Sequence, residues 1–250
     1  MMVDTNYNEP RLVALYDEDN AGQWDTDFYA GLVGDKPLRI ADVGCGTGSF
    51  AVRLALAGHT LTGIDPARGM LDAARSRAGG EKATWLQGTA VDLPPGPFDA
   101  ALMTGHAFQC LLTEAEILET LVAVRSRLVS GGTFYFETRN PAAKAWLAWD
   151  SGSTGPKIQE SSAGTLEVEW ELISAEEQYD GVLVTFEDRT LFRSDGERFV
   201  SRSILKFVRA EVLKDLLNRA GFNSVDWYGD WEGGPFMEAS SREIIVAARR

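Results

Sequence analysis

The sequence predicts an α/β fold in which a doubly wound, mostly parallel sheet carries an antiparallel β insertion after its fifth strand. From Leu38 to Glu137, short apolar runs alternate with segments of helical period, a pattern typical of parallel strands joined by right-handed helical crossovers. After Pro141 the period changes to two, and apolar residues from Leu166 to Leu172 alternate with glutamates. That alternation indicates an antiparallel strand with one solvated face.

Glycines and a capping box mark the ends of the expected elements. Gly58, Gly79 and Gly131 follow helical runs and act as stop signals, whereas Thr113 and Glu116 form a capping box that opens a helix. The first five strands are expected at 38–43, 60–64, 83–87, 98–103 and 132–137, with helices at 49–57, 67–78 and 113–128. Further strands are expected at 166–172, 182–186, 199–208, 225–228 and 243–248, with a loop at 151–155 and a helix at 210–220.

Composition and charge disfavour nucleic-acid-binding, membrane and metal-binding proteins. Thirty-seven acidic against 24 basic residues give a formal net charge of -13, a field that repels polyanions, so we expect no nucleic-acid partner. No apolar run approaches the length of a membrane span, and no secretory signal is visible, so no membrane partner is expected. The two cysteines make neither a disulfide framework nor a metal site, which favours a cytoplasmic protein without a metal.

Unusual residues follow the expected strands at their carboxyl ends, where open parallel sheets bind ligands. The first strand runs into Gly44-Cys45-Gly46-Thr47-Gly48, whose glycines permit positive φ and close approach of a ligand. Ser49 stands where a dinucleotide fingerprint has its third glycine, and no Gly-Lys-Ser/Thr of a P-loop follows. Asp65 ends the second strand and can accept both hydroxyls of a ribose, or cap the helix after it. The pattern predicts an adenosine-like ligand without a required pyrophosphate.

These motifs resemble those of the class I S-adenosylmethionine-dependent methyltransferases, a Rossmann-like family. The resemblance rests on Asp42 to Gly48, Gly63-Ile64-Asp65, Gly88 to Pro94 and Phe98-Asp99, and it covers roughly 38–137. It is closest to the small-molecule branch of the family. It implies a seven-stranded sheet whose last strand is antiparallel, with S-adenosyl-L-methionine as the cofactor.

Carried over residue by residue, the resemblance implies the position of each part of the cofactor. The methionine moiety would lie against Gly44, Cys45, Gly46 and Gly48, and Thr104 and His106 would line its sulfonium end. The ribose would bind Asp65. The adenine would lie near Pro66, Met70, Thr89 and Ala90. Many relatives have aspartate where Thr89 stands, so a charge-assisted bond to the adenine amine is lost here.

Acceptor contacts are expected from residues around that sulfonium end. His106 follows the fourth strand, where a neutral imidazole can take a proton from the acceptor or simply shape the wall. Arg139 and Asn140 follow the fifth strand, and Arg139 suits an acceptor carboxylate or a surface ion pair. Tyr16 and Trp24 belong to an N-terminal stretch that resembles a helical lid, or they pack on the core.

We therefore expect a single domain: a helical lid at 1–37, a cofactor-binding core at 38–140, a loop and antiparallel β insertion at 141–208, and a C-terminal helix with the last strands at 209–250. The expected activity is methyl transfer to a small-molecule acceptor by direct displacement, in a monomer or a homodimer. One alternative is a non-catalytic S-adenosylmethionine-binding module, which S-adenosylhomocysteine formation would exclude. The other is a nicotinamide-dependent oxidoreductase, which Ser49 disfavours.

Overall fold

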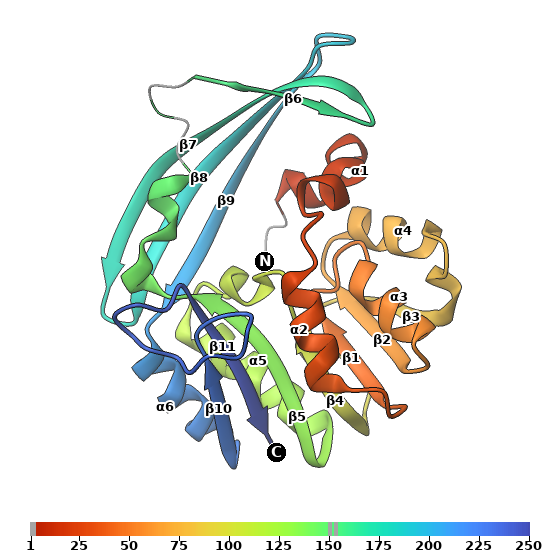
Figure 1. Ribbon diagram of the computed structural model, residues 1–250, viewed down its shortest axis with the longest axis vertical. Helices are drawn as coiled ribbons and strands as arrows, with labels where there is room; N and C mark the ends of the chain where they lie inside the picture. The colour runs from red at the N-terminus through yellow and green to blue at the C-terminus, as the bar shows by residue number, and fades with distance from the viewer. Residues whose placement is uncertain (1–3, 150–151, 153–154) are drawn as a thin grey trace.

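A seven-stranded sheet with helices on both faces forms the body of the computed structural model, which describes residues 4–149, 152 and 155–250 (Figure 1). Its strands are β1 (Arg39–Val43), β2 (Thr60–Asp65), β3 (Ala83–Gln87), β4 (Phe98–Met103), β5 (Leu128–Arg139), β10 (Ser224–Tyr228) and β11 (Glu243–Arg249). The helices are α1 (Pro10–Asp19), α2 (Trp24–Val33), α3 (Ser49–Leu56), α4 (Arg68–Ser76), α5 (Glu114–Arg127) and α6 (Ala210–Ala220). Short 3-10 turns are η1 (Thr5–Tyr7), η2 (Gly80–Lys82), η3 (Ala90–Asp92), η4 (Ala107–Cys110), η5 (Pro141–Ala143) and η6 (Ala145–Ala148).

The strand order is β10-β11-β5-β4-β1-β2-β3, and β11 alone runs antiparallel to its neighbours. This order confirms the predicted doubly wound, seven-stranded sheet with an antiparallel last strand. Because β1 lies between β4 and β2, the strand order reverses beside it. The carboxyl end of β1 is therefore the place where such a sheet opens a binding crevice.

Two apolar layers hold the helices against the sheet. On one face α5 and α6 bury Leu121 and Leu216 against Phe134 and Phe136 of β5. On the other face α2 and α3 bury a second cluster that contains Tyr29 and Phe50. Each such side chain contributes roughly 1.5–3 kcal/mol by leaving water, so the strands are rigidly placed and their carboxyl ends with them.

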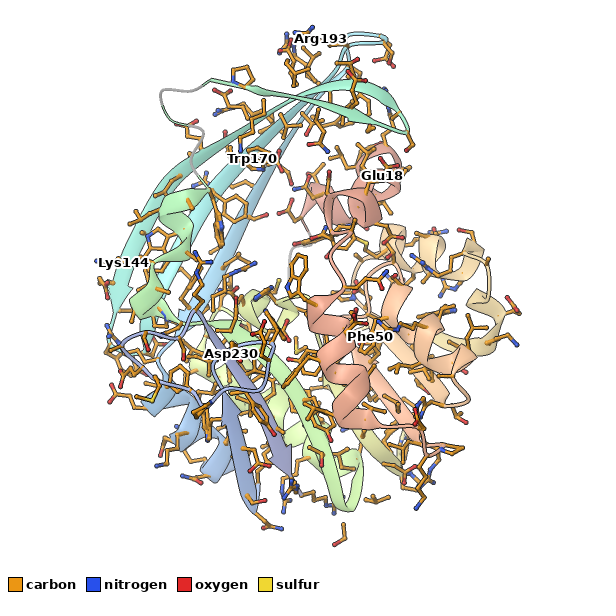
Figure 2. The ribbon with its side chains drawn as sticks, in the orientation of Figure 1. Glu18, Phe50, Lys144, Trp170, Arg193 and Asp230 are labelled. Atoms are coloured by element: carbon orange, nitrogen blue, oxygen red, sulfur yellow. The ribbon has the colours of Figure 1, made fainter. Side chains whose placement is uncertain are left out.

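A second sheet of four antiparallel strands follows β5, as predicted: β6 (Lys157–Ser161), β7 (Gly164–Gln178), β8 (Gly181–Phe192) and β9 (Arg198–Val208). It extends from the carboxyl edge of the main sheet as a long curved ribbon, and α1 lies beside it (Figure 1). Leu12 and Leu15 of α1 pack against Phe192 in a cluster that Trp170 adjoins (Figure 2). Trp146 of η6 packs against Phe207 near the base of the sheet.

Several element boundaries differ from the sequence prediction. β6 was not predicted, because Lys157–Ser161 lacks an apolar alternation and depends on pairing with β7. β5 begins at Leu128, directly after α5, because Leu128 pairs with Phe98, so Gly131 lies inside the strand and does not end the helix. Most of the loop expected at 151–155 lies outside the described residues.

Candidate active site

The glycine loop after β1 adopts backbone conformations that only glycine enters freely. Gly44, Gly46 and Gly48 have φ of 69°, 53° and 72°. A Cβ on Gly44 would lie 2.8 Å from Ala107 of η4, and one on Gly48 would clash with the Trp85 ring. A Cβ on Gly46 would meet nothing within 4 Å. Gly46 therefore leaves open space for a ligand, whereas its neighbours allow close packing of the protein itself.

Asp65, at the end of β2, ties this loop to the start of α4. Its Oδ2 accepts from the Gly46 amide at 2.9 Å, and its Oδ1 accepts from the Ala67 amide at 2.8 Å. Burial raises the pKa of Asp65, and the two backbone hydrogen bonds oppose that rise. The expected role as N-cap of α4 is wrong, because the N-cap is Ala67 and no side chain caps the helix; Asp65 instead fixes the turn before it. The remaining lone pairs of the carboxylate can accept from further hydroxyls.

The residues expected around adenine lie beside Asp65 and beneath the N-terminal segment. Met70 is buried and packs in one cluster with Tyr7 and Tyr16. The Thr89 amide donates to Asp92 Oδ2 at 2.9 Å in a capping box that fixes the Thr89-Ala90 turn. The Pro66 carbonyl accepts from Gln87. Tyr7 was missed by the sequence reasoning, since nothing in a polar N-terminal stretch marks one tyrosine as buried.

Two more buried carboxylates lie at strand ends, and the sequence reasoning assigned them no role. Asp42 on β1 has an Oδ1 atom that is buried without a partner among the described residues. Burial, and then the nearby Asp65 and Glu137, raise the pKa of Asp42 to about 7. Burial also raises the pKa of Glu137 on β5. In the sequence, each of these residues is a carboxylate within an apolar run, and that pattern could have marked it as a site residue. Together the two carboxyls favour a ligand with positive charge.

His106 is fixed from two strands. It has a left-handed φ of 60°, and its amide donates to Glu137 Oε1 at 2.5 Å. Its Nε2 lies 3.0 Å from Glu243 Oε2 on β11. Tyr29 donates to the other Glu137 oxygen at 2.6 Å. Glu243 was also missed, because it lies 137 residues away along the chain.

Arg139 lies at the same edge, and burial lowers its pKa. It donates to Gln109 Oε1 at 2.7 Å, and its guanidinium lies 4.9 Å from the Trp149 ring centroid. Among the described residues, no carboxylate forms an ion pair with it. The charges of Glu243 and Glu137 oppose that lowering of the pKa from a longer distance, and the partly buried guanidinium has donors that suit an acidic ligand group.

The other three expected acceptor residues have different surroundings. Asn140 donates to the Glu238 and Ser241 carbonyls, both at 2.8 Å, and so holds a surface loop. Trp24 is 64% exposed in the first turn of α2. Tyr16 lies near Asp65, and burial raises its pKa to about 12. The structure thus brings Tyr16 to the site, whereas Asn140 and Trp24 face elsewhere and remain predictions.

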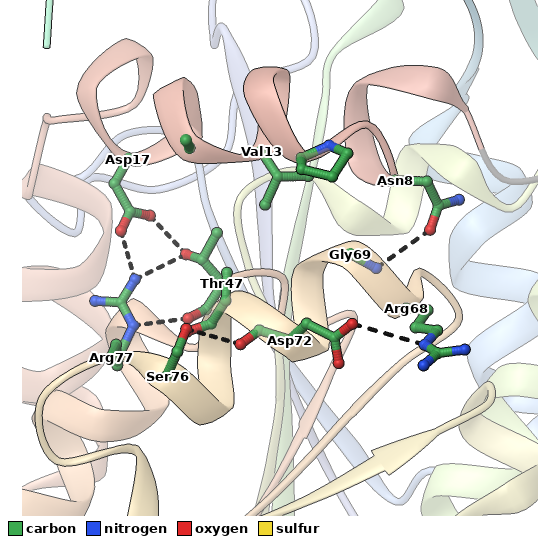
Figure 3. Close-up of a pocket in the computed structure, with 12 residues that line it drawn as sticks. Asn8, Val13, Asp17, Thr47, Arg68, Gly69, Asp72, Ser76 and Arg77 are labelled. Atoms are coloured by element: carbon green, nitrogen blue, oxygen red, sulfur yellow. Dashed lines mark hydrogen bonds and ion pairs between the residues drawn. The ribbon is translucent and has the colours of Figure 1, made fainter. Parts of the chain in front are cut away.

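The N-terminal segment is fastened to the glycine loop. Arg77, after α4, donates from Nε to the Thr47 carbonyl at 2.7 Å and forms an ion pair with Asp17 of α1 (Figure 3). Thr47 in turn donates from its hydroxyl to Asp17 at 2.5 Å. Beside these contacts lies a surface pocket of about 650 Å³ between α1 and α4. Of the residues expected to bind cofactor, none lines this pocket.

The described part of the chain holds no metal cluster and no membrane-spanning helix. No group of three or more histidine, cysteine, aspartate or glutamate side chains there can hold a metal ion. Over the same residues, no helix is both long and apolar enough to cross a membrane.

Comparisons of sequence agree with this architecture. A family model described as a methyltransferase domain matches residues 40–132. Over 127 residues the chain is 36% identical to the ubiquinone biosynthesis O-methyltransferase of Chromobacterium violaceum, covering 48% of this chain and 51% of that protein. The chain spans about half the length of the curated relatives it matches.

Solved structures extend the likeness to the whole chain. An S-adenosylmethionine-dependent methyltransferase of Clostridium acetobutylicum has a TM-score of 0.75 at 17% identity, covering 96% of this chain and 98% of that one. CalS10, an amino pentose methyltransferase of Micromonospora echinaspora, has a TM-score of 0.66 at 19% identity, covering 94% and 97%. At such identities the likeness shows the fold alone.

The glycine loop, the acidic strand ends and the sheet order define a Rossmann-like nucleoside-binding protein. Within that class, residues 40–132 match the methyltransferase-domain family, and the chain has the fold of an S-adenosylmethionine-dependent methyltransferase. S-adenosylmethionine is the cofactor of this family.

Proposed function

We propose that this chain transfers a methyl group from S-adenosylmethionine to a small-molecule acceptor. The observation that carries the proposal is the open space at Gly46, whose amide donates to the Asp65 carboxylate, with Met70 and its neighbours Tyr7 and Tyr16 packed beyond Asp65. When bound, the donor supplies a methyl group on a sulfonium that is already an activated leaving group. The protein's task is then to align donor and acceptor and to exclude water, which contributes several kcal/mol.

The residues present fit the donor. The proposed contacts are those that the family resemblance implies: Gly44, Cys45, Gly46, Gly48, Asp65, Pro66, Met70, Thr89, Ala90 and Thr104. In support, Asp42 and Glu137 are buried carboxyls with raised pKa values, and a nearby positive charge favours their ionised forms; the donor carries an ammonium and a sulfonium. Burial raises the pKa of the Cys45 thiol, so Cys45 acts as a small wall residue and not as a nucleophile.

The antiparallel sheet is the proposed acceptor side. Trp149 packs between Arg139 and Phe207 of β9, so an acceptor held by Arg139 would be enclosed by aromatic rings. CalS10 shares this architecture over almost the whole chain and is named for an amino pentose, which supports a small acceptor here. A non-catalytic binding module remains the alternative, and S-adenosylhomocysteine formation with an added acceptor excludes it.

Three further inferences concern the whole protein. The net charge of -13 favours a small-molecule acceptor over a nucleic acid. Cys45 and Cys110 are free thiols, which supports a cytoplasmic location. The protein is expected to be a monomer or a homodimer, and light scattering distinguishes the two.

Calorimetric titration with S-adenosylmethionine, S-adenosylhomocysteine and NAD tests the donor assignment. We expect micromolar binding of the first two and none of NAD. Asp65→Ala should weaken binding by about tenfold to a hundredfold, since a hydrogen bond to a charged group contributes about 1.5–3 kcal/mol. Binding of NAD alone would overturn the proposal.

Asp99→Ala is the matched control for that substitution. Asp99 is also a sheet carboxylate, but it pairs with Arg39 at the opposite end of β1. Its removal should leave donor affinity unchanged. Equal affinity in Asp65→Ala and wild type would contradict the ribose assignment.

A further inference from the structure

His106 is held by carboxylates from two neighbouring strands. Glu137 on β5 accepts from its backbone amide, and Glu243 on β11 contacts its ring through Nε2. The left-handed backbone of a non-glycine residue is strained, so these contacts must maintain it. Glu243 faces the ring directly and Glu137 acts on His106 electrostatically. Those two glutamates are in turn faced by Arg139, and Tyr29 and Asp25 face Glu137.

The contact with Glu243 decides which ring nitrogen can accept a proton. An ionised carboxylate only accepts hydrogen bonds, so a neutral ring facing it carries its hydrogen on Nε2. Nδ1 is then the basic nitrogen. Among the described residues, the hydrogen bond of the ring is made by Nε2, and Nδ1 has no partner. Nδ1 is not among the buried side-chain atoms that lack a partner, so it is not fully buried. Nδ1 therefore reaches accessible space with its lone pair unused.

The ring also lies between the two walls of the proposed site. The next residue, Ala107, abuts Gly44 of the glycine loop. On the other side, Glu243 pairs across the strands with Arg139, which contacts Gln109 and Trp149. A base between the donor loop and the acceptor side is placed where a nucleophile must lose its proton.

We propose that His106 and Glu243 form a general-base dyad that serves a hydroxyl acceptor, an inference that rests on the proposed function. The acceptor O–H bond breaks and its proton goes to Nδ1. The oxygen electron pair forms the bond to the methyl carbon, and the carbon–sulfur electrons leave on sulfur. Glu243 stabilises the resulting imidazolium. A hydroxyl needs such a base because its pKa is about 10 or above, whereas a neutral amine already has a free lone pair.

Nitrogen-15 NMR of the histidine rings tests the dyad without any acceptor. The chain has only two histidines. His59 accepts from the Leu38 amide through Nδ1, so its neutral ring also carries hydrogen on Nε2, and a His59→Gln variant assigns the signals. At about pH 8.5, well above the usual histidine pKa of about 6.5, wild-type His106 should be the Nε2–H tautomer.

Glu243→Gln should shift His106 toward a mixture of tautomers while donor affinity stays within twofold. Asp226→Asn is the matched control: it removes an ion pair with Arg249 at the far end of the same strands and should leave His106 unchanged. A wild-type ring with hydrogen on Nδ1 would overturn the dyad. If the wild-type protein does not bind the donor, the proposed function is overturned instead. The two failures are distinguishable, because the tautomer of His106 does not depend on donor binding.

Turnover with matched phenols, alcohols, amines and thiols tests the acceptor class. We expect S-adenosylhomocysteine only with hydroxyl compounds, reduced about a hundredfold in His106→Gln and about tenfold or more in Glu243→Gln. Turnover of an amine or thiol that His106→Gln leaves intact would contradict a hydroxyl acceptor.

Discussion

At the scale of single residues, the site keeps three carboxylates out of water at the ends of β1, β2 and β5. Asp42 is the most affected, because burial raises its pKa from 3.8 to about 7. Between these values the unfolded chain has lost this proton and the folded chain retains it. The free energy of unfolding therefore falls as the pH rises through this window, and the contribution is fully present only below about pH 4.

We predict that Asp42→Asn reduces this pH dependence. In the absence of donor, wild type should lose up to about 1.4 kcal/mol of unfolding free energy per pH unit from Asp42 between about pH 5 and 7. Urea unfolding at pH 5, 6, 7 and 8 measures the slope. Asp99→Asn should keep the wild-type slope, because the Arg39 guanidinium lowers the pKa of Asp99 to about 2, outside the window. If Asp42→Asn has the same slope as wild type, groups other than Asp42 cause the pH dependence of the unfolding free energy.

At the scale of elements, α1 is joined to the cofactor loop by few polar contacts. Arg77 contacts the Thr47 carbonyl, the Thr47 hydroxyl and Asp17. Because Thr47 lies within the glycine loop, these contacts couple the position of α1 to the loop that would hold the donor. Release of α1 would expose Met70 and the Asp65 side of the crevice.

Arg77→Ala should therefore speed the release of S-adenosylhomocysteine. Hydrogen bonds of this kind contribute about 0.5–1.5 kcal/mol each, so we expect a rate increase of roughly three- to tenfold. Stopped-flow displacement measures the release, and hydrogen exchange in α1 reports its detachment. Arg75→Ala is the matched control, since among the described residues the ion pair of Arg75 is with Asp72 on the same helix. Equal release rates in both variants would show that α1 does not control exit.

The elements that could be predicted are those whose signals are local. The bounds of β3, β4 and α6 follow from an apolar run or a helical period closed by glycine or proline, so 83–87, 98–103 and 210–220 match the structure. The Thr113 capping box is present with both of its hydrogen bonds. In contrast, β6 and the full length of β7 depend on cross-strand pairing, which no single segment encodes.

The residues of the candidate site also divide into those that the local sequence predicts and those that depend on distant contacts. The glycine loop and Asp65 are readable because backbone freedom and a strand-end carboxylate are local requirements. Glu243 contacts His106 across 137 residues of sequence, and Tyr7 reaches Met70 only after the N-terminal segment folds back. Asn140 looked like a binding residue at a strand end, yet its amide bonds two carbonyls of a distant loop.

At the scale of the whole molecule, the net charge favours positively charged ligands over nucleic acids. The net charge of -13 attracts cations, and a cation bound near Asp42 and Glu137 would favour the ionised forms of these buried carboxyls. The methyl donor carries two positive groups, so the field favours its approach. A nucleic acid would have to overcome the repulsion of this net negative charge.

We therefore predict that a fluorescein-labelled RNA 20-mer shows no saturable anisotropy change with this protein at about 50 mM salt. Low salt is the stringent condition, because electrostatic binding to nucleic acid is strongest there. Donor binding in the same buffer is the positive control for folded protein. Micromolar RNA binding that weakens steeply with added salt would contradict a small-molecule acceptor, and it would reveal a basic surface that outweighs the net charge. Absence of RNA binding beside intact donor binding would leave the hydroxyl compounds as the acceptors to pursue.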